Sequence, residues 1–228
     1  MQSDFAVSAN KIGDVLAAQG DLAGALAQYR DALDIQKALM QIDPSNAQWQ
    51  RDLSTSDEKL GDVLIARGDL PGALSAYRDS LATRERLAKA DPGNADWQRD
   101  LSVSHNNVGD VLIARGNVSD ALAAYRDSLA IREHLAKADP GNAGWQRDLA
   151  VIYKSIGDVL RKQRDVAGAV ASYHDWIAIL KALIKIGAKV VTHGRYVTFQ
   201  MAEVTVPRQM SAEILSLIAQ LRALPAPA

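Results

Sequence analysis

Gly61-Asp62-Val63-Leu64 is the stretch of sequence that decides the fold, because the same four residues return at a fixed interval. Copies stand at 13–16, 109–112 and 157–160, so each copy begins 48 residues after the one before it. A period of this length indicates a stacked repeat, in which each unit is too small to bury its apolar face alone. The sequence therefore predicts an array of repeated units.

Each unit contains the signals of two helices joined by a tight turn, as the second unit illustrates. Asn46 can cap a first helix that runs to about Gly68, with apolar residues at helical spacing. Gly68 can end that helix in the left-handed conformation, and Asp69 can cap a second helix that begins at Leu70. Asp91 precedes Pro92 and ends the second helix, because a residue before proline avoids the helical conformation. The predicted units lie near 1–45, 46–93, 94–141 and 142–186.

This pattern resembles the tetratricopeptide repeat, in which Leu-Gly in the first helix is followed by an alanine and an aromatic residue in the second. The second unit matches at Leu60-Gly61, Ala73 and Tyr77. The other units carry the corresponding residues Ile12-Gly13, Ala25 and Tyr29, then Val108-Gly109, Ala121 and Tyr125, then Ile156-Gly157, Ala169 and Tyr173. The unit is about 14 residues longer than the standard motif, and Glu85 stands where that motif has proline. The resemblance, closest in kind to the long-helix repeats of kinesin light chains, implies a mainly α fold: an α-solenoid of about four helical hairpins over 1–186.

Small and aromatic residues at repeated positions have a packing role in this prediction. Gly61 and Ala73 stand where the two helices of a hairpin come closest, and Tyr77 fills the next space. Three tryptophans also return at one position of the repeat, and these are Trp49, Trp97 and Trp145. We expect them in the core between hairpins rather than stacked on a ligand, because buried aromatic rings contribute large apolar areas.

The aspartate after the repeated glycine is the sharpest candidate for function. In tetratricopeptide arrays this position, and the one four residues before it, face the ligand in a concave groove. The resemblance therefore implies a partner-binding row of eight residues: Asn10, Asp14, Glu58, Asp62, Asn106, Asp110, Lys154 and Asp158. Such a line of carboxylates suits a basic or amide-rich extended peptide. The alternative is that Asp14 and Asp62 only pair with Lys11 and Lys59, three residues earlier on the same helix.

The chain after residue 186 follows a different pattern. Two stretches on either side of His193-Gly194 alternate as strands do, and Ser211 opens an amphipathic helical stretch. We expect a C-terminal β-hairpin and helix over 187–228. Residues 184–228 also resemble the C-terminal tail of bacterial insertion-sequence transposases, without any catalytic core. The resemblance implies a fusion at a mobile element that has no transposition activity.

The first residues of the chain already fit the repeat register. Residues 1–5 align with residues 49–53, with Gln2 and Asp4 matching Gln50 and Asp52. We therefore expect either an array cut from a longer one or a natural end that is capped by a second copy of the chain.

Composition and motifs argue against several classes of protein. The charge is nearly balanced, with 26 basic and 27 acidic residues, and the basic excess of the tail is small, so nucleic-acid binding is not favoured. The chain contains no cysteine, no signal peptide pattern and no apolar run long enough for a membrane span, so we expect a soluble, cytoplasmic, bacterial protein. It carries no phosphate-binding, metal-binding or nucleophile motif. We therefore expect no catalytic residue, no metal, no cofactor and no enzymatic activity.

These observations favour a non-enzymatic scaffold that binds a peptide or partner segment in the concave groove of the array. The alternative is a truncated fusion of repeats and a transposase tail, without a ligand of its own, that dimerises through its exposed ends.

Overall fold

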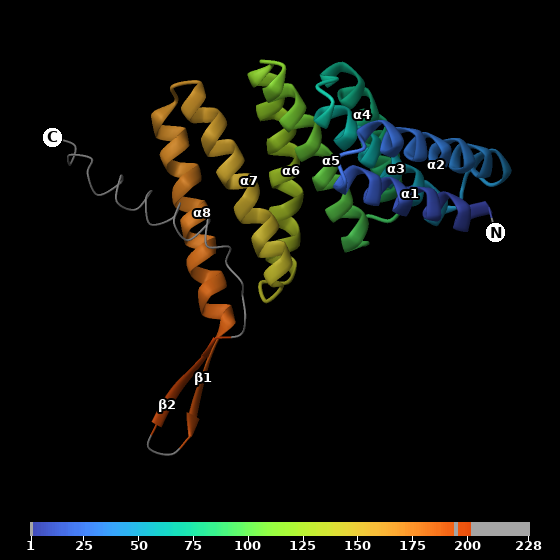
Figure 1. Ribbon diagram of the computed structural model, residues 1–228. Coiled ribbons are helices and arrows are strands. Elements are labelled where there is room, and N and C mark those ends of the chain that lie inside the picture. The colour runs from blue at the N-terminus through green and yellow to red at the C-terminus, as the bar shows by residue number, and fades with distance from the viewer. Residues whose placement is uncertain (1, 194–195, 202–228) are drawn as a thin grey trace.

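The computed structural model describes residues 2–193 and 196–201, and these form an array of helices followed by two strands (Figure 1). The helices are α1 Gln2–Ala18, α2 Leu22–Ile42, α3 Ala47–Ala66, α4 Leu70–Ala90, α5 Ala95–Ala114, α6 Val118–Ala138, α7 Ala143–Lys162 and α8 Val166–Gly187. The strands are β1 Ala188–His193 and β2 Tyr196–Met201.

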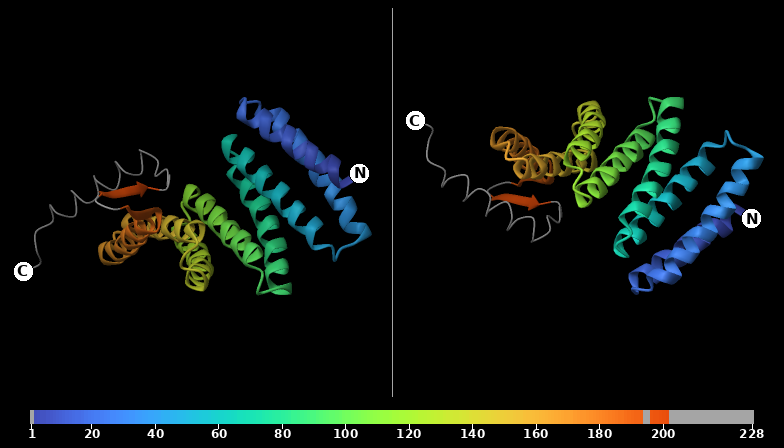
Figure 2. Two further views of the ribbon diagram at one scale, coloured as in Figure 1. Left: turned by 90° about the horizontal axis from the view of Figure 1, so that it is seen from below. Right: turned by 90° about the horizontal axis from the view of Figure 1, so that it is seen from above.

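Consecutive helices pair into four hairpins, α1 with α2, α3 with α4, α5 with α6 and α7 with α8, and each hairpin packs on the next (Figure 1). Seen along a perpendicular direction, the hairpins turn relative to one another from the N-terminal to the C-terminal end (Figure 2). The predicted array of four helical repeats is therefore confirmed. From α3 to α7 the helix bounds repeat at the 48-residue interval of the sequence.

The residues that cap the helices are those that the repeat pattern predicts. Asn46 accepts a hydrogen bond through Oδ1 from the backbone nitrogen of Trp49 at 3.1 Å, and Asn94 and Asn142 cap α5 and α7 in the same way. At the other end of α3, Gly68 has a φ of 79°, in the left-handed region that glycine adopts without strain. Short turns therefore join the two helices of each hairpin.

Glycine at the repeated position lets the two helices of a hairpin approach. A Cβ atom placed on Gly61 would lie 2.6 Å from Cε1 of Tyr77, which is closer than two carbon atoms can come. The same contact recurs in all four hairpins, with distances of 2.5 to 2.6 Å. The predicted packing role of Gly61 is confirmed, and its neighbour is the ring of Tyr77, while Ala73 is fully buried nearby in sequence on α4.

One apolar cluster runs through the array from α2 to α8. The repeated valine shows how this core depends on the preceding hairpin. Val63, Val111 and Val159 are 3%, 0% and 3% exposed, whereas Val15 on α1 is 57% exposed. Phe5 and Ile12 on α1 are exposed as well, so α1 presents an open apolar side where α3, α5 and α7 present a packed one.

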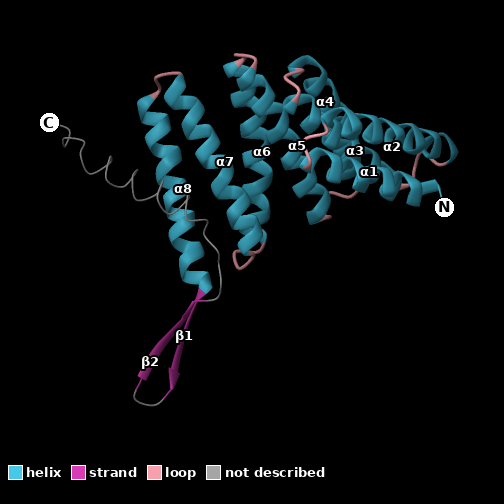
Figure 3. Cartoon of the chain, viewed as in Figure 1, coloured by secondary structure: helices cyan, strands magenta, loops and turns pink. Residues whose placement is uncertain are grey.

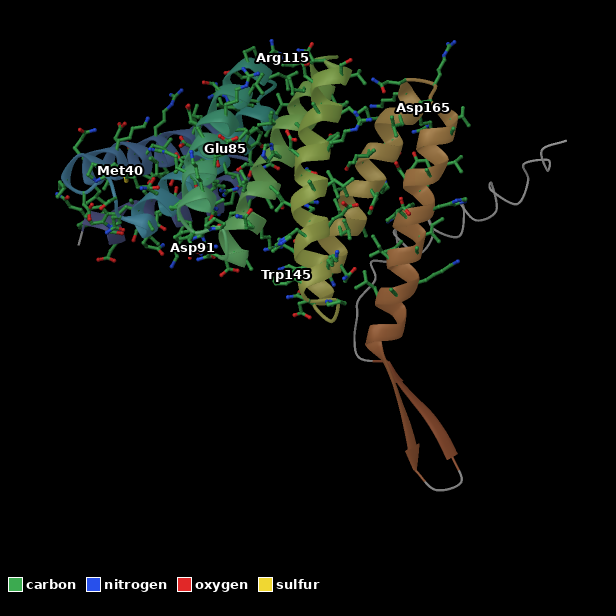
Figure 4. All side chains as sticks on the ribbon, turned by 180° about the vertical axis from the view of Figure 1, so that it is seen from behind. Met40, Glu85, Asp91, Arg115, Trp145 and Asp165 are labelled. Carbon is green, nitrogen blue, oxygen red and sulfur yellow. The ribbon has the colours of Figure 1, made fainter. Side chains whose placement is uncertain are left out.

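The three repeated tryptophans do not lie in the core between hairpins, and this prediction is wrong. Trp49, Trp97 and Trp145 are only partly buried, and none of them belongs to the buried clusters of the described chain. Each stands in the first turn of its helix, next to the loop that connects its hairpin to the preceding one. Figure 4 shows Trp145 at the end of the array where these loops lie, with Asp91, and Arg115 at the opposite end. A ring at the rim of the layer cannot be covered on all sides.

The end of the described chain departs from the helical pattern. Strands β1 and β2 pair antiparallel, with Ala188 opposite Met201 and His193 opposite Tyr196 (Figure 3). The expected turn at Gly194 and the helix expected from Ser211 lie outside the described residues. No helix within residues 2–193 combines the length and apolar character that crossing a membrane requires.

Candidate functional site

The four aspartates of the predicted row are held by tyrosines of their own hairpins. Each accepts a hydrogen bond through Oδ1 from the hydroxyl of the tyrosine that packs on the preceding glycine. The donor–acceptor distances are 2.8 Å for Tyr29–Asp14, 2.5 Å for Tyr77–Asp62, 2.5 Å for Tyr125–Asp110 and 2.7 Å for Tyr173–Asp158. A single tyrosine therefore fills the space beside the glycine and fixes the aspartate above it.

The lysine partners proposed from the sequence are wrong. Lys59 does not pair with Asp62 on its own helix but reaches back to α1, where its Nζ lies 2.6 Å from Oδ1 of Asp14. This pair joins two hairpins. Residues three apart on one helix are neighbours, but here the partner of Lys59 comes from the first helix of the preceding hairpin.

Two carboxyl groups of the row, those of Asp62 and Asp110, are partly desolvated by the protein around them. Burial raises the pKa of Asp62 and of Asp110, and the hydrogen bond from each tyrosine acts in the opposite direction. Both residues nevertheless keep an exposed edge. The row therefore combines a fixed geometry with access from solvent.

The residues four positions before the aspartates have different partners in each hairpin. Asn10 donates through Nδ2 to Oγ of Ser56 on α3 at 2.7 Å. Asn106 donates through Nδ2 to Oδ2 of Asp110 at 2.9 Å, and Lys154 pairs with Asp158 at 3.0 Å. The predicted row thus lies along α1, α3, α5 and α7; the contact of Asn10 joins two hairpins, whereas those of Asn106 and Lys154 stay within one helix.

Glu58 is the member of the row that connects three helices. It pairs with Nη2 of Arg84 on α4, and its Oε1 accepts a hydrogen bond of 3.0 Å from Nδ2 of Asn107 on α5. Arg84 is 4% exposed, and its Nη1 donates to Oγ of Ser104 at 3.0 Å and to the carbonyl oxygen of Asp100 at 3.1 Å. A buried guanidinium group thus connects α3, α4 and α5.

Arg132 repeats this arrangement one hairpin further along. Its Nε lies 3.3 Å from Oγ of Ser102, as Nε of Arg84 lies 3.3 Å from Oγ of Ser54. Its Nη1 donates to the carbonyl oxygen of Asp148 at 2.7 Å. Arg132 is 6% exposed, and burial lowers its pKa.

Gln36 occupies the same repeat position in the first hairpin, where it is 2% exposed. Within the described residues, the buried side-chain oxygen and nitrogen atoms that lack a partner are Nε2 and Oε1 of Gln36 and Oδ1 of Asn10 and Asn106. All four atoms belong to the two repeat positions that Glu58 and Arg84 fill in the second hairpin. Buried polar groups normally find partners. The hairpins therefore differ at these two repeat positions, where the second hairpin satisfies its polar atoms and the first and third leave some unpartnered.

Sequence reasoning missed this layer of Gln36, Arg84 and Arg132. The available signal was a polar residue on the inner side of the second helix, three residues before the buried Leu87 and at the same register in three units. A long polar side chain at a core position indicates a buried interaction. Its partners, however, come from the neighbouring hairpin and cannot be read from one unit.

Comparison with known proteins gives one family. A family model described as a tetratricopeptide repeat matches residues 5–45, 58–92 and 104–140. These matches cover the first three hairpins in large part. A search of curated proteins finds no significant match.

Solved structures of similar shape cover most of the array. The crystal structure of BtubC (BKLC) from P. vanneervenii has a TM-score of 0.65 and 20% identity, over 86% of this chain and 69% of that one. The apo form of RapI has a TM-score of 0.63 and 15% identity, over 82% of this chain and 47% of that one. Aspartyl phosphate phosphatase F from Bacillus subtilis has a TM-score of 0.62 and 12% identity, over 82% and 44%. At these identities the likeness concerns the fold alone.

Proposed function

Because the chain contains tetratricopeptide repeats, we propose that it is a non-enzymatic scaffold that binds an extended or helical segment of a partner protein. The segment would lie in the concave groove of the array, along the face of α1, α3, α5 and α7 that carries the predicted row. Helical repeats of this type are typical of protein-interaction scaffolds.

The observation that carries this proposal is the tyrosine-held row of aspartates. Asp14, Asp62, Asp110 and Asp158 stand at the same repeat position on the first helix of successive hairpins, and each accepts a hydrogen bond from a tyrosine of its own hairpin. Fixed acceptors lose little conformational entropy when a ligand binds, which favours affinity and register. A partner segment that is rich in lysine or amide side chains would match this row.

The proposal is tested with Asp62→Asn combined with Asp110→Asn. Asparagine keeps an oxygen that can accept the tyrosine hydrogen bond and removes the charge, so the fold should persist while binding weakens. We expect at least about tenfold weaker binding of a lysine- and asparagine-rich 12-residue peptide, selected on the wild-type chain and followed by fluorescence anisotropy at low salt.

The matched control is Glu85→Gln combined with Asp96→Asn, which removes the same charge from two exposed residues away from the row. An equal loss of affinity in both double variants would reduce the effect to net charge. Unchanged binding in the row variant would contradict the proposed role of the aspartates.

The proposal also includes the source of the protein, its location in the cell and its class of partner. We expect a bacterial, cytoplasmic protein with a protein or peptide partner and without nucleic acid. The homodimer and the transposase likeness of residues 184–228 stay predictions, as does the C-terminal hairpin with its following helix as a unit that packs on the array.

A further inference from the structure

The second and third hairpins differ in what the Nη2 atom of their buried arginine binds. Arg84 uses Nη2 to bind the carboxylate of Glu58, whereas Nη2 of Arg132 has no hydrogen-bond partner among the described residues. Nε of both groups binds a serine hydroxyl, and Nη1 of both binds the carbonyl oxygen of an aspartate on the next hairpin, so the two guanidinium groups are oriented alike. Nη1 of Arg84 also binds Ser104, whose place in the next hairpin is taken by the buried Ile152. Nη2 of Arg132 is also absent from the buried unpartnered atoms of the described chain, which means that it reaches solvent.

A shorter side chain explains why this nitrogen has no partner. Asn106 stands where the second hairpin has Glu58, and it is one methylene group shorter and uncharged. Its Nδ2 binds Asp110 and its Oδ1 is buried without a partner, so it does not reach Arg132. The carboxylate that Arg84 binds through Nη2 in the second hairpin therefore has no counterpart at Nη2 of Arg132 in the third.

The repeat register supplies a second donor for this position. Oε1 of Glu58 accepts a hydrogen bond from Asn107, and the residue at the corresponding position of the next hairpin is Ser155 on α7. Ser155 is partly exposed, and its hydroxyl has no partner among residues 2–193. A hydroxyl can donate to a carboxylate as an amide does, although it is shorter.

The two carboxylates near Arg132 already have partners of their own. Asp148 is near Arg132, but its carboxylate pairs with Arg99 at 2.6 Å. Asp110 is also near, and it accepts the hydroxyl of Tyr125. In the second hairpin a carboxylate occupies the equivalent place beside Asp62, so the local field there tolerates one.

We infer that the third hairpin holds a binding position for a carboxylate of the partner, between Nη2 of Arg132 and the hydroxyl of Ser155. The Glu58 carboxylate in the second hairpin is the internal template of this position. A guanidinium group with an unpartnered nitrogen favours a carboxylate, because charge-assisted hydrogen bonds are about twice as strong as neutral ones. The partner segment then carries an acidic group among its basic and amide residues, which deepens the proposed function and rests on it.

The test uses small carboxylates and the 15N-labelled full chain. N-acetyl-glutamate N-methylamide represents an acidic side chain, N-acetylglycine represents a chain end, and N-acetyl-glutamine N-methylamide is the neutral control. The readout is the Nε–H signal of Arg132, assigned by its loss in Arg132→Lys. We expect a saturable shift with one or both carboxylates and at least about tenfold weaker binding of the glutamine probe. The stronger of the two carboxylates identifies a side chain or a chain end as the source.

Asn106→Glu is the decisive variant, because it supplies the missing carboxylate from the chain itself. We expect it to raise the melting temperature and to abolish the response of Arg132 to the probes. Asn10→Glu is the matched control: it makes the same change in the first hairpin, where Gln36 replaces the arginine, and should leave the Arg132 response intact. Glu58→Asn should open a second position and make the Nε–H signal of Arg84 respond.

Two results would overturn the inference: an equal response to the glutamine probe, or a response of undiminished affinity in Asn106→Glu. Binding of these small probes at Arg132 does not depend on the proposed peptide-binding groove, so the two proposals are tested separately. If the Asp62 and Asp110 variant binds the peptide as well as the wild type while Arg132 responds to the carboxylate probes, the proposed row is wrong and the carboxylate position stands. If the variant binds the peptide more weakly while Arg132 does not respond to the probes, only the carboxylate position is wrong.

Discussion

At the scale of single residues, Asp57 is an ionisable side chain whose burial disfavours its charged form. It is 6% exposed on α3, at a repeat position where the other hairpins carry Ala9, His105 and Tyr153. Burial raises the pKa of Asp57 to about 7, the nearby charge of Asp79 adds to this effect, and Lys37 opposes it. The folded state therefore prefers the protonated form.

This shift predicts how stability depends on pH. The unfolded chain releases the Asp57 proton at about pH 4, and the folded chain keeps it up to about pH 7. Stability from this group is therefore lost as the pH rises between these values, and Asp57→Asn should remove the loss. We expect the variant to gain roughly 1 to 3 kcal/mol in free energy of unfolding at pH 8 and little at pH 4.

Urea unfolding at both pH values checks this prediction, with Asp96→Asn as a control because Asp96 is exposed. A gain of the same size at pH 4 and pH 8 would assign the effect to packing rather than to ionisation.

The contacts of the repeated Gly-Asp pair show how far single residues could be predicted from the sequence. A glycine that recurs inside a helix has few uses other than close packing, so the role of Gly61 followed from its position. The bond between Asp62 and Tyr77 did not follow, because it joins residues 15 apart whose meeting depends on how two helices are rotated about their axes. Such rotations are set by the whole hairpin.

At the scale of elements, the turn between α7 and α8 differs from the other three. Gly20, Gly68 and Gly116 have φ values of 84°, 79° and 82°, and in the fourth turn Arg164 has a φ of 65°. A residue with a Cβ atom is strained in this left-handed region by about 1 to 2 kcal/mol. The helices impose the turn even where the sequence no longer supplies glycine.

Arg164→Gly should therefore stabilise the chain. We expect a gain of about 0.5 to 1 kcal/mol, because relief of the strain is partly offset by the greater freedom of glycine in the unfolded state. Thermal unfolding followed by circular dichroism measures it, and Gly116→Arg is the matched reverse change. A lower melting temperature for Arg164→Gly would contradict the strain.

At the scale of the whole molecule, each hairpin buries its first helix on the hairpin before it. Val15, which has no preceding hairpin, is exposed, whereas the equivalent residues of the later hairpins are buried: Val63, Val111 and Val159. Stability in such an array is the sum of what each hairpin supplies and what each interface supplies. The same residue type at one repeat position therefore contributes different amounts along the chain.

Val15→Lys and Val63→Lys compare the two environments directly. At Val63 the charge would be buried without a partner, and we expect a loss of several kcal/mol, at least about 3. At Val15 the lysine reaches solvent, and we expect a change within about 0.5 kcal/mol. Denaturant unfolding of both variants at one protein concentration gives the two values, and equal losses would show that α1 is covered in solution.

The array as a whole was predictable because a strict period dictates repeated units and repeated caps dictate helix ends. The contacts between hairpins were not, as the pair of Lys59 with Asp14 and the rim position of Trp145 illustrate. A period states which residues are equivalent. It does not state how far one unit is turned against the next, and that angle decides which side chains meet.

The partners that Arg84 and Arg132 share also have a genetic consequence. Each guanidinium takes its partners from its own hairpin and from the next one, at positions that repeat with the 48-residue interval. An in-frame exchange between two copies of the repeat therefore deletes or duplicates one complete hairpin and restores equivalent neighbours on both sides of the joint. We expect such recombination to lengthen or shorten the protein by whole hairpins, so that array length is as open to selection as any single side chain.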